Sequence, residues 1–323
     1  MIRVGYPVTL ALELLRDFPA GIELIPVSDK LERDVEIDVW IPDPYPTRAI
    51  RAWPRLRGVK LIISMLAGTE WISPLAGPHV TICNARGAHN AATAEWALAA
   101  ILTTLKYFPI YQDVQRSGVW KRRFDAAAHY KAITGDATSL DPPAMLEELS
   151  GKRVLLVGYG EIGKETERML APFQVELTRV ARSSRSEPKV HSSAELDRLI
   201  PSAEIIVVIV PATNETRGLI GAAQFALMRQ GTLLVNAARG AVVDTVALIE
   251  ALNAGKIRAA IDVTDPEPLP EGHPLWSCPN LLITPHVAAS SPQFARNALR
   301  VVGEELRRYI NGEPLKNVVQ QTV

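Results

Sequence analysis

Three side chains in the second half of the chain have the types that carbonyl and proton chemistry needs. Arg239 follows the apolar run 232–235, and its rigid fork of donors can hold a carboxylate and a neighbouring carbonyl oxygen together. His286 comes just after the run 281–284, and an imidazole gives and takes protons near neutral pH. Glu267 lies in a proline-rich loop, and a carboxylate there would orient the imidazole and raise its pKa. Taken singly, each has a structural alternative: a surface salt bridge, a structural histidine and a solvated loop acid.

A glycine-rich turn predicts a dinucleotide site. The apolar run 153–157 meets Gly158, Gly160 and Gly163 in the spacing G-x-G-x-x-G, and a helical pattern follows. The first glycine makes the turn, the second lets backbone N–H groups approach a pyrophosphate, and the third lets helix and strand pack closely. A plain βα turn also favours glycine, so the flanking strand and helix carry the prediction. The predicted contacts are Gly158, Tyr159, Gly160, Glu161, Ile162 and Gly163.

The elements that must position these residues alternate between strand and helix patterns, which is typical of βα units and parallel sheets. We expect an α/β protein with two doubly wound, Rossmann-like domains and a cleft between them. Prolines 42, 44 and 46 predict a loop, and the polar residues 121–150 predict a loop-rich passage. The expected helices cover residues 91–105, 246–252 and 293–310. The expected strands cover residues 2–6, 22–27, 39–41, 61–66, 80–83, 153–157, 175–180, 204–210, 232–238, 257–263 and 281–284.

Composition narrows the functional class. Of 323 residues, 47% are hydrophobic and 22% charged, and 35 basic side chains balance 35 acidic ones, which makes nucleic acid an unlikely partner. The amino terminus lacks a secretory apolar core and the apolar runs are too short to cross a membrane, so we expect a cytoplasmic protein. With only Cys83 and Cys278, we expect neither a disulfide framework nor a metal site.

Four segments in order resemble the D-isomer-specific 2-hydroxyacid dehydrogenases, including glyoxylate/hydroxypyruvate reductases. They are the glycine turn, Asn-Ala-Ala-Arg-Gly at 236–240, Asp-Pro-Glu-Pro-Leu-Pro at 265–270 and Thr-Pro-His at 284–286. The resemblance covers nearly all of the chain from about residue 61 onward.

The resemblance implies a role for each candidate. Arg239 would grip the substrate's carboxylate and carbonyl, His286 would exchange the proton, and Glu267 would support His286. It places Asp262 near the nicotinamide, further cofactor contacts at Pro211, Thr216 and Ala237, and the substrate carboxylate on the backbone of Ala67 and Gly68. It also implies a homodimer, a discontinuous substrate domain (residues 1–90 and 287–323) and a dinucleotide-binding domain (residues 91–286).

One departure concerns the cofactor. An acidic residue usually binds the ribose 2′-hydroxyl about twenty residues after the glycine turn. This chain instead has Arg182, Ser183 and Arg185 there, without a carboxylate. Two positive charges and a hydroxyl suit a 2′-phosphate, so we predict that NADP(H) is preferred over NAD(H).

We therefore expect an oxidoreductase that passes a hydride between a nicotinamide cofactor and a small 2-ketoacid or D-2-hydroxyacid, in the reductive direction. Glyoxylate and hydroxypyruvate are the favoured substrates, whereas formate is disfavoured because related formate dehydrogenases have an amide where this chain has Glu267. The alternative is an NAD(P)-sensing interaction protein, similar to corepressors that resemble this family. The substrate's side chain and the role of residues 121–150 stay open at this stage.

Overall fold

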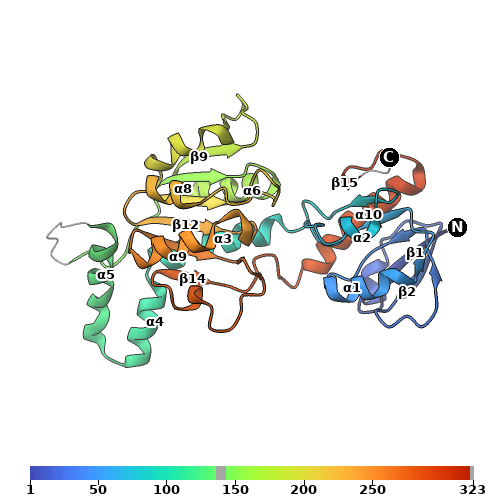
Figure 1. Cartoon of the computed structure of the whole chain (residues 1–323), viewed down its shortest axis with the longest axis horizontal. Coiled ribbons are helices and arrows are strands. Elements are labelled where there is room, and N and C mark those ends of the chain that lie inside the picture. The colour runs from blue at the N-terminus through green and yellow to red at the C-terminus, as the bar shows by residue number, and fades with distance from the viewer. Residues whose placement is uncertain (136–142, 321–323) are drawn as a thin grey trace. The chain divides into compact units, whose positions relative to one another are not determined.

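The computed structural model describes residues 1–135 and 143–320, which form two compact units (Figure 1). Unit 1 contains Met1–His89 and Ser290–Val323, and unit 2 contains Asn90–Ala289. Unit 1 is therefore discontinuous in sequence.

Unit 1 is built on a six-stranded sheet with the order β15-β7-β6-β4-β1-β2. Its strands are parallel except β15, which runs antiparallel to β7. The five strands predicted in the first ninety residues are confirmed, although β6 is three residues shorter than expected. A separate two-stranded sheet pairs β3 with β5. The bounds are β1 Ile2–Pro7, β2 Ile22–Val27, β3 Val35–Glu36, β4 Val39–Trp40, β5 Leu56–Arg57, β6 Leu61–Ile63, β7 Thr81–Cys83 and β15 Val318–Gln320.

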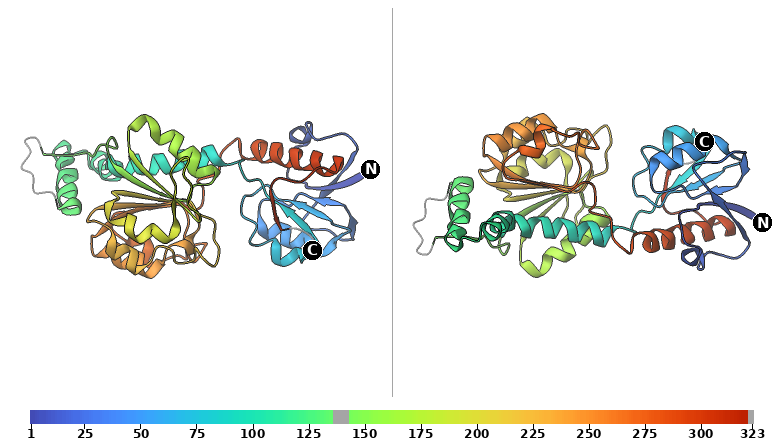
Figure 2. Two further views of the ribbon diagram at one scale, coloured as in Figure 1. Left: turned by 90° about the horizontal axis from the view of Figure 1, so that it is seen from above. Right: turned by 90° about the horizontal axis from the view of Figure 1, so that it is seen from below.

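Helices cover both faces of the unit 1 sheet (Figure 2). One face packs against α10 (Phe294–Asn311) and the short η1 (Leu12–Leu15), and the other against α1 (Pro46–Ala52) and η2 (Trp53–Arg55). Helix α2 spans Ser73–Ala76. The prediction that Pro46 belongs to a loop was wrong, since Pro46 is the first residue of α1. Proline fits there because the first helical N–H needs no intrahelical partner.

Unit 2 is built on a seven-stranded parallel sheet with the order β10-β9-β8-β11-β12-β13-β14. The order reverses between β8 and β11, which is where open α/β sheets bind ligands. Each strand predicted here is confirmed, although β11, β12 and β13 end two residues earlier than expected and β10 was not predicted. Strand β11 is buried at every position, which explains its β-branched run. The bounds are β8 Arg153–Val157, β9 Glu176–Ala181, β10 His191–Ser192, β11 Ile205–Val208, β12 Thr232–Asn236, β13 Ile257–Ile261 and β14 Leu281–Ile283.

Two helix layers enclose this sheet (Figure 2). Helices α3 (Asn90–Leu105) and α6 (Glu161–Leu170) pack on one face, and α7 (Leu196–Leu199), α8 (Ala222–Leu227) and α9 (Thr245–Asn253) pack on the other. Short helical turns lie in the connections: η4 Ala171–Phe173, η5 Ser193–Glu195, η6 Ile200–Ser202, η7 Gly240–Val242 and η8 Pro274–Ser277.

The passage predicted to be loop-rich is largely helical before residue 135. After α4 (Phe108–Ser117) come η3 (Trp120–Phe124) and α5 (Asp125–Thr134), so the prediction was wrong for these residues. Helix α5 buries only Ala126 and Ile133, and it is capped by Gly135, which adopts the left-handed conformation. Two buried positions are too few to give a visible period in the sequence. Residues 136–142 of the same prediction lie outside the described part of the chain.

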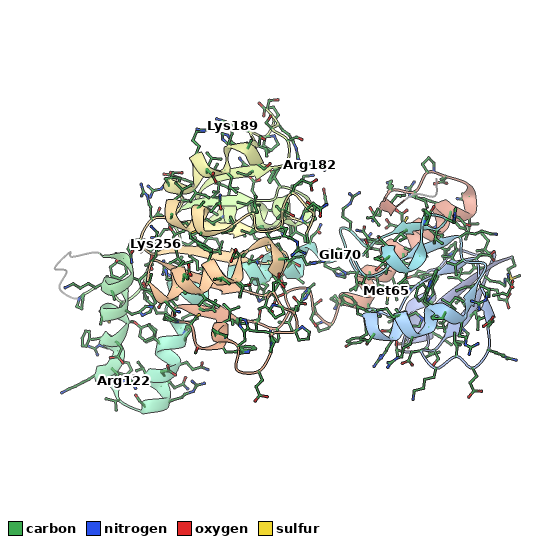
Figure 3. All side chains as sticks on the ribbon, viewed as in Figure 1. Met65, Glu70, Arg122, Arg182, Lys189 and Lys256 are labelled. Atoms are coloured by element: carbon green, nitrogen blue, oxygen red, sulfur yellow. The ribbon has the colours of Figure 1, made fainter. Side chains whose placement is uncertain are left out.

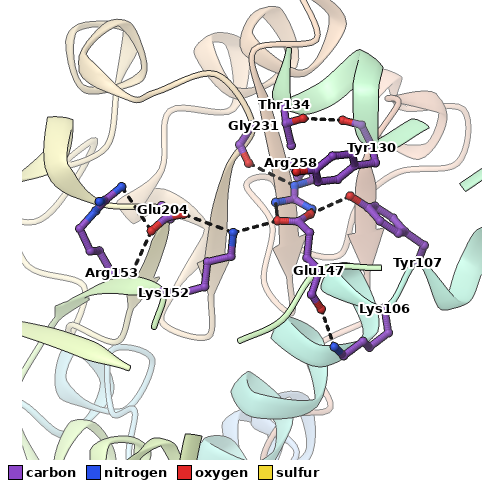
Figure 4. Close-up of polar contacts among 10 residues, drawn as sticks. All are labelled: Lys106, Tyr107, Tyr130, Thr134, Glu147, Lys152, Arg153, Glu204, Gly231 and Arg258. Atoms are coloured by element: carbon purple, nitrogen blue, oxygen red, sulfur yellow. Dashed lines mark hydrogen bonds and ion pairs between the residues drawn. The ribbon is translucent and has the colours of Figure 1, made fainter. Parts of the chain in front are cut away.

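A buried polar cluster fastens the segment before β8 to the amino ends of the strands (Figure 4). The carboxylate of Glu147 lies 2.6 Å from Arg258, and both side chains are about 95% buried. The Tyr107 hydroxyl donates to Glu147 at 2.7 Å, and Lys152 joins Glu147 to Glu204. Burial acts to raise the pKa of Glu147, but the pair with Arg258 and the other donors outweigh it and hold that pKa below its ordinary value. The carboxylate therefore stays charged in a closed site.

Candidate active site

The candidate residues of unit 2 stand at one edge of its sheet, because each comes just after the carboxyl end of a parallel strand. The order along that edge follows the order of the strands. It runs Arg182 after β9, Gly158 after β8, Pro211 after β11, Arg239 after β12, Asp262 after β13 and His286 after β14.

The glycine turn has the geometry of a dinucleotide cradle. Gly158 has φ +113°, and a Cβ there would lie 2.0 Å from the carbonyl oxygen of Ile209. A Cβ on Gly163 would lie 2.2 Å from the carbonyl oxygen of Gly158. Gly160 differs, because its Cβ would meet no described atom within 4 Å, and it caps α6 without a side-chain hydrogen bond. The space over Gly160 and the open N–H groups of α6 therefore fit a diphosphate.

Other predicted cofactor contacts of unit 2 lie beside the turn in sequence or in the loop after β11. Glu161, exposed at the start of α6, pairs with Lys164 at 3.0 Å, and Ile162 is half-buried. In the loop after β11, the Thr216 hydroxyl donates to the carbonyl of Pro211 at 2.6 Å. Pro211 and Thr216 thus lie in one short loop and are joined by this hydrogen bond.

Arg239 is positioned by a buried asparagine. Asn236, 1% exposed, accepts from the N–H of Ala238 at 3.0 Å and donates to the carbonyl of Arg239 at 3.1 Å. The next residue, Gly240, packs so tightly that a Cβ would lie 1.9 Å from the carbonyl oxygen of Thr264. The backbone on both sides of Arg239 is therefore fixed, and Ala237 is half-buried within the same turn.

His286 and Glu267 form a direct pair. His286 Nδ1 lies 2.5 Å from a Glu267 oxygen, and both side chains are partly exposed. The hydrogen bond to Glu267 raises the pKa of His286 above its ordinary value, although burial and Arg239 oppose this. The same bond, opposed by burial and aided by Arg239, lowers the pKa of Glu267. His286 also has φ +54°, which is uncommon for a non-glycine residue, and it shares this conformation with Tyr107, Gln174 and Asn280.

Asp262 holds the loop that carries His286. Its carboxylate, 2% exposed, accepts from the Thr284 hydroxyl at 2.5 Å and from the N–H groups of Val287 at 2.9 Å and Ala288 at 2.8 Å. Its own carbonyl accepts from the N–H of His286 at 2.7 Å. Asp262 thus sets the backbone of the histidine from both sides.

A pocket of about 220 Å³ opens beside the pair. Its walls include Glu267, Leu269, Trp276, Ile283 and His286. The Trp276 indole is half exposed and donates to the carbonyl of Pro270 at 2.9 Å. Asp262, Thr264 and Thr284 also line it, so this pocket combines apolar walls with several polar groups around the imidazole.

The remaining predicted residues lie elsewhere. Arg182, Ser183 and Arg185 are exposed after β9, and Figure 3 shows Arg182 at the surface of unit 2. Ala67 and Gly68 belong to unit 1, in the loop after β6. The side chain of Asn84 donates to the carbonyl of Ala67 at 2.7 Å and so fixes that loop.

Sequence reasoning assigned no role to Asn236 or Asn84 and missed the tie from Asp262 to the histidine loop. One signal was present: asparagine at a strand end often bonds the backbone two residues onward. Asn236 does this with Ala238.

The sequence matches a known protein family over more than half of its length. The family model described as "D-isomer specific 2-hydroxyacid dehydrogenase, NAD binding domain" matches residues 98–288. The chain belongs to this family. It is similar to D-3-phosphoglycerate dehydrogenase of Archaeoglobus fulgidus, with 32% identity over 244 residues, covering 74% of this chain and 43% of that protein. It is also similar to glyoxylate reductase of Aeropyrum pernix, with 29% identity over 337 residues, covering 95% and 94%.

Among solved structures of this family, the chain is similar to the NADPH-dependent glyoxylate/hydroxypyruvate reductase of Sinorhizobium meliloti, crystallised with NADP and sulfate. The TM-score is 0.79 at 25% identity, covering 98% of this chain and 97% of that one. Membership of the 2-hydroxyacid dehydrogenases makes the chain an NAD(P)-dependent oxidoreductase, and nothing in these comparisons supports the sensor alternative.

No helix within residues 1–135 and 143–320 is long and apolar enough to cross a bilayer. The same residues contain no group of three or more histidine, cysteine or acidic side chains placed to hold a metal ion.

Proposed function

We propose that this protein reduces a small polar 2-ketoacid, such as glyoxylate or hydroxypyruvate, to the D-2-hydroxyacid with NADPH. The observation that carries the proposal is the His286–Glu267 pair, which stands with Arg239 at the same sheet edge as the glycine turn. The names of the similar proteins from Aeropyrum pernix and Sinorhizobium meliloti support the choice of substrate.

The contact between His286 and Glu267 indicates which imidazole nitrogen exchanges a proton with the substrate. Because Nδ1 of His286 is engaged by Glu267, the proton given to the substrate's carbonyl oxygen leaves from Nε2. Glu267 favours the charged imidazolium and keeps the ring oriented. Arg239 binds the substrate carboxylate and stabilises charge that develops on the carbonyl oxygen. A bound reduced nicotinamide would supply the hydride.

The two units divide the work in this proposal. Unit 2 binds the dinucleotide, with the diphosphate over Gly160 and the nicotinamide toward Asp262. Unit 2 also carries Arg239 and His286, and unit 1 would add the backbone N–H groups of Ala67 and Gly68 as further donors to the substrate carboxylate. The hydrogen bond from the Asn84 side chain to the carbonyl of Ala67 supports this role, because it restrains the backbone of that loop.

NADP(H) is the proposed cofactor. Arg182, Ser183 and Arg185 are exposed just after β9 and bring no carboxylate to compete with a 2′-phosphate. The expected result is a kcat/KM for NADPH at least about tenfold above that for NADH, since a charge-assisted hydrogen bond is worth roughly 1.5–3 kcal/mol. A preference for NADH would contradict this part of the proposal.

The decisive experiment is a steady-state assay of glyoxylate, hydroxypyruvate, formate and bulkier 2-ketoacids with both cofactors. Turnover of a small 2-ketoacid supports the proposal, whereas cofactor binding without turnover of any substrate would favour a sensor. The cytoplasmic location and the homodimer stay predictions, and size-exclusion chromatography with light scattering tests the second.

A further inference from the structure

The residue between the first two glycines of the turn is a large aromatic side chain. Tyr159 is 7% exposed, and its hydroxyl donates to Glu167 in α6 at 2.5 Å. Arg179, on the adjoining strand β9, also binds Glu167 through two N–H groups, one of them at 2.9 Å. The three side chains thus tie the glycine turn, helix α6 and strand β9 together.

The Tyr159 ring also contacts the arginine predicted to meet the 2′-phosphate. The guanidinium carbon of Arg185 lies 5.9 Å from the ring centroid, and that of Arg179 lies 5.7 Å from it. A cation within about 6 Å of an aromatic face is attracted by the ring quadrupole. The backbone of Arg185 is held as well, because its N–H and C=O pair with Val190 at 3.0 and 2.9 Å. The exposed arginine is therefore restrained at both its backbone and its head group.

Tyr159 and Arg179 also engage a carboxylate close to the cofactor site, that of Glu167. An ionised Glu167 close to the end of β9 would repel a phosphate, or would accept a ribose hydroxyl and favour NAD(H). Here two N–H groups of Arg179 and the Tyr159 hydroxyl occupy it. Glu167 and Arg179 then cancel in charge. Arg185 stays beside the turn as a positive charge, whereas Arg182 interacts electrostatically with Glu215.

We propose that Tyr159 is a positioning residue for cofactor choice: its ring places Arg185 for the 2′-phosphate, and together with Arg179 it occupies Glu167. This inference rests on the proposed preference for NADP(H). It adds that a residue of the glycine turn helps to determine the cofactor preference, in addition to Arg182, Ser183 and Arg185 in the loop after β9.

The test compares binding of two probes by calorimetry, adenosine 2′,5′-bisphosphate and adenosine 5′-monophosphate, which differ only in the 2′-phosphate. Tyr159→Leu removes the ring and should lower the ratio of their affinities about fivefold, which lies within the range for a cation–π contact. Tyr159→Phe keeps the ring and should hold the ratio within about twofold. Arg185→Ala removes the proposed phosphate contact directly and serves as the positive control.

A second pair of variants tests the carboxylate. Arg179→Met should release Glu167 and lower the ratio, and adding Glu167→Gln to it should restore the ratio. These variants keep the proposal testable if Tyr159→Leu fails to fold, which circular dichroism would show. The ratio of kcat/KM for NADPH and NADH should follow the same order.

The outcomes separate the two proposals. Wild-type protein that binds both probes alike would overturn the 2′-phosphate site and this inference with it. Wild-type protein that discriminates, with a ratio that is lowered by Arg185→Ala but unchanged in both Tyr159→Leu and Arg179→Met, would overturn this inference alone. A ratio lowered equally by Tyr159→Phe and Tyr159→Leu would also refute the role of the ring.

Discussion

Replacing Glu267 with glutamine is the sharpest test of the proposed proton relay. The amide keeps the size of the side chain and removes its negative charge. Because the bond to Glu267 is the main reason that the pKa of His286 is raised, this pKa should fall in the variant. The reduction needs the imidazolium, so the activity of either enzyme should decline as pH rises through the pKa of His286. In the variant that decline should begin at lower pH.

The magnitude follows from the exposure of the pair. A hydrogen bond between charged groups contributes roughly 1.5–3 kcal/mol. The His286 and Glu267 side chains are 44% and 39% exposed, so solvent screening reduces this to about 1 kcal/mol. The corresponding loss in kcat/KM at neutral pH is about fivefold, because a tenfold change requires about 1.4 kcal/mol. At acid pH, where both enzymes carry the imidazolium, the loss should shrink.

The assay is the pH profile of kcat/KM for ketoacid reduction, with Glu271→Gln as the matched control. Glu271 is an exposed acid four residues onward in the same loop, and its replacement should leave the profile in place. For oxidation of the hydroxyacid the sign reverses, because that direction needs the neutral imidazole. Parallel profiles for wild type and Glu267→Gln, with an equal loss at every pH, would refute the reasoning.

Three further predictions concern other parts of the site and its support. Arg239→Lys should lower kcat/KM by about 10²–10³ in steady-state assays, since lysine lacks the planar fork, and near-normal turnover would remove Arg239 from the mechanism. Gly163→Ala should lower the free energy of unfolding in urea by roughly 1–3 kcal/mol, because its Cβ would lie 2.2 Å from a carbonyl oxygen. Gly160→Ala should stay within about 0.5 kcal/mol of wild type but weaken cofactor binding. Equal stability of the two variants would contradict the packing argument. Glu147→Gln should lower the free energy of unfolding by about 3–5 kcal/mol, because it leaves the buried charge of Arg258 without its carboxylate. Glu148→Gln, at the exposed neighbour, should change it little. Equal melting temperatures for the two variants would count against a charged buried pair.

Much of the fold was predictable because the parallel strands are buried on both faces. The run at 205–208 is wholly apolar and β-branched, and every residue of it is buried. The glycine turn was predictable for a similar reason, since close backbone approach at Gly158 and Gly163 excludes other residues. In both cases a few consecutive residues are enough to show the requirement, which is burial on both faces for the strand and close backbone approach for the glycines.

What escaped prediction depends on partners far away in the chain. Glu147 and Arg258 are 111 residues apart, and the sequence around either residue does not indicate that the two form a pair. Helix α5 rests on two buried side chains, too few for a period, and the roles of Asn236 and Asp262 depend on which backbone groups the fold brings to them. Polar side chains with tertiary partners are therefore the part of a site that sequence patterns describe least.

The row of strand ends in unit 2 has an evolutionary consequence. Strands lie about 4.8 Å apart, so the arginine loop after β9 and the residues after β12 to β14 are separated by three to five spacings, roughly 14–24 Å. Substitutions that far apart without shared partners usually have additive effects. During evolution, substitutions after β9 could therefore change which coenzyme is used, while the acid–base residues after β12 to β14 are inherited unchanged.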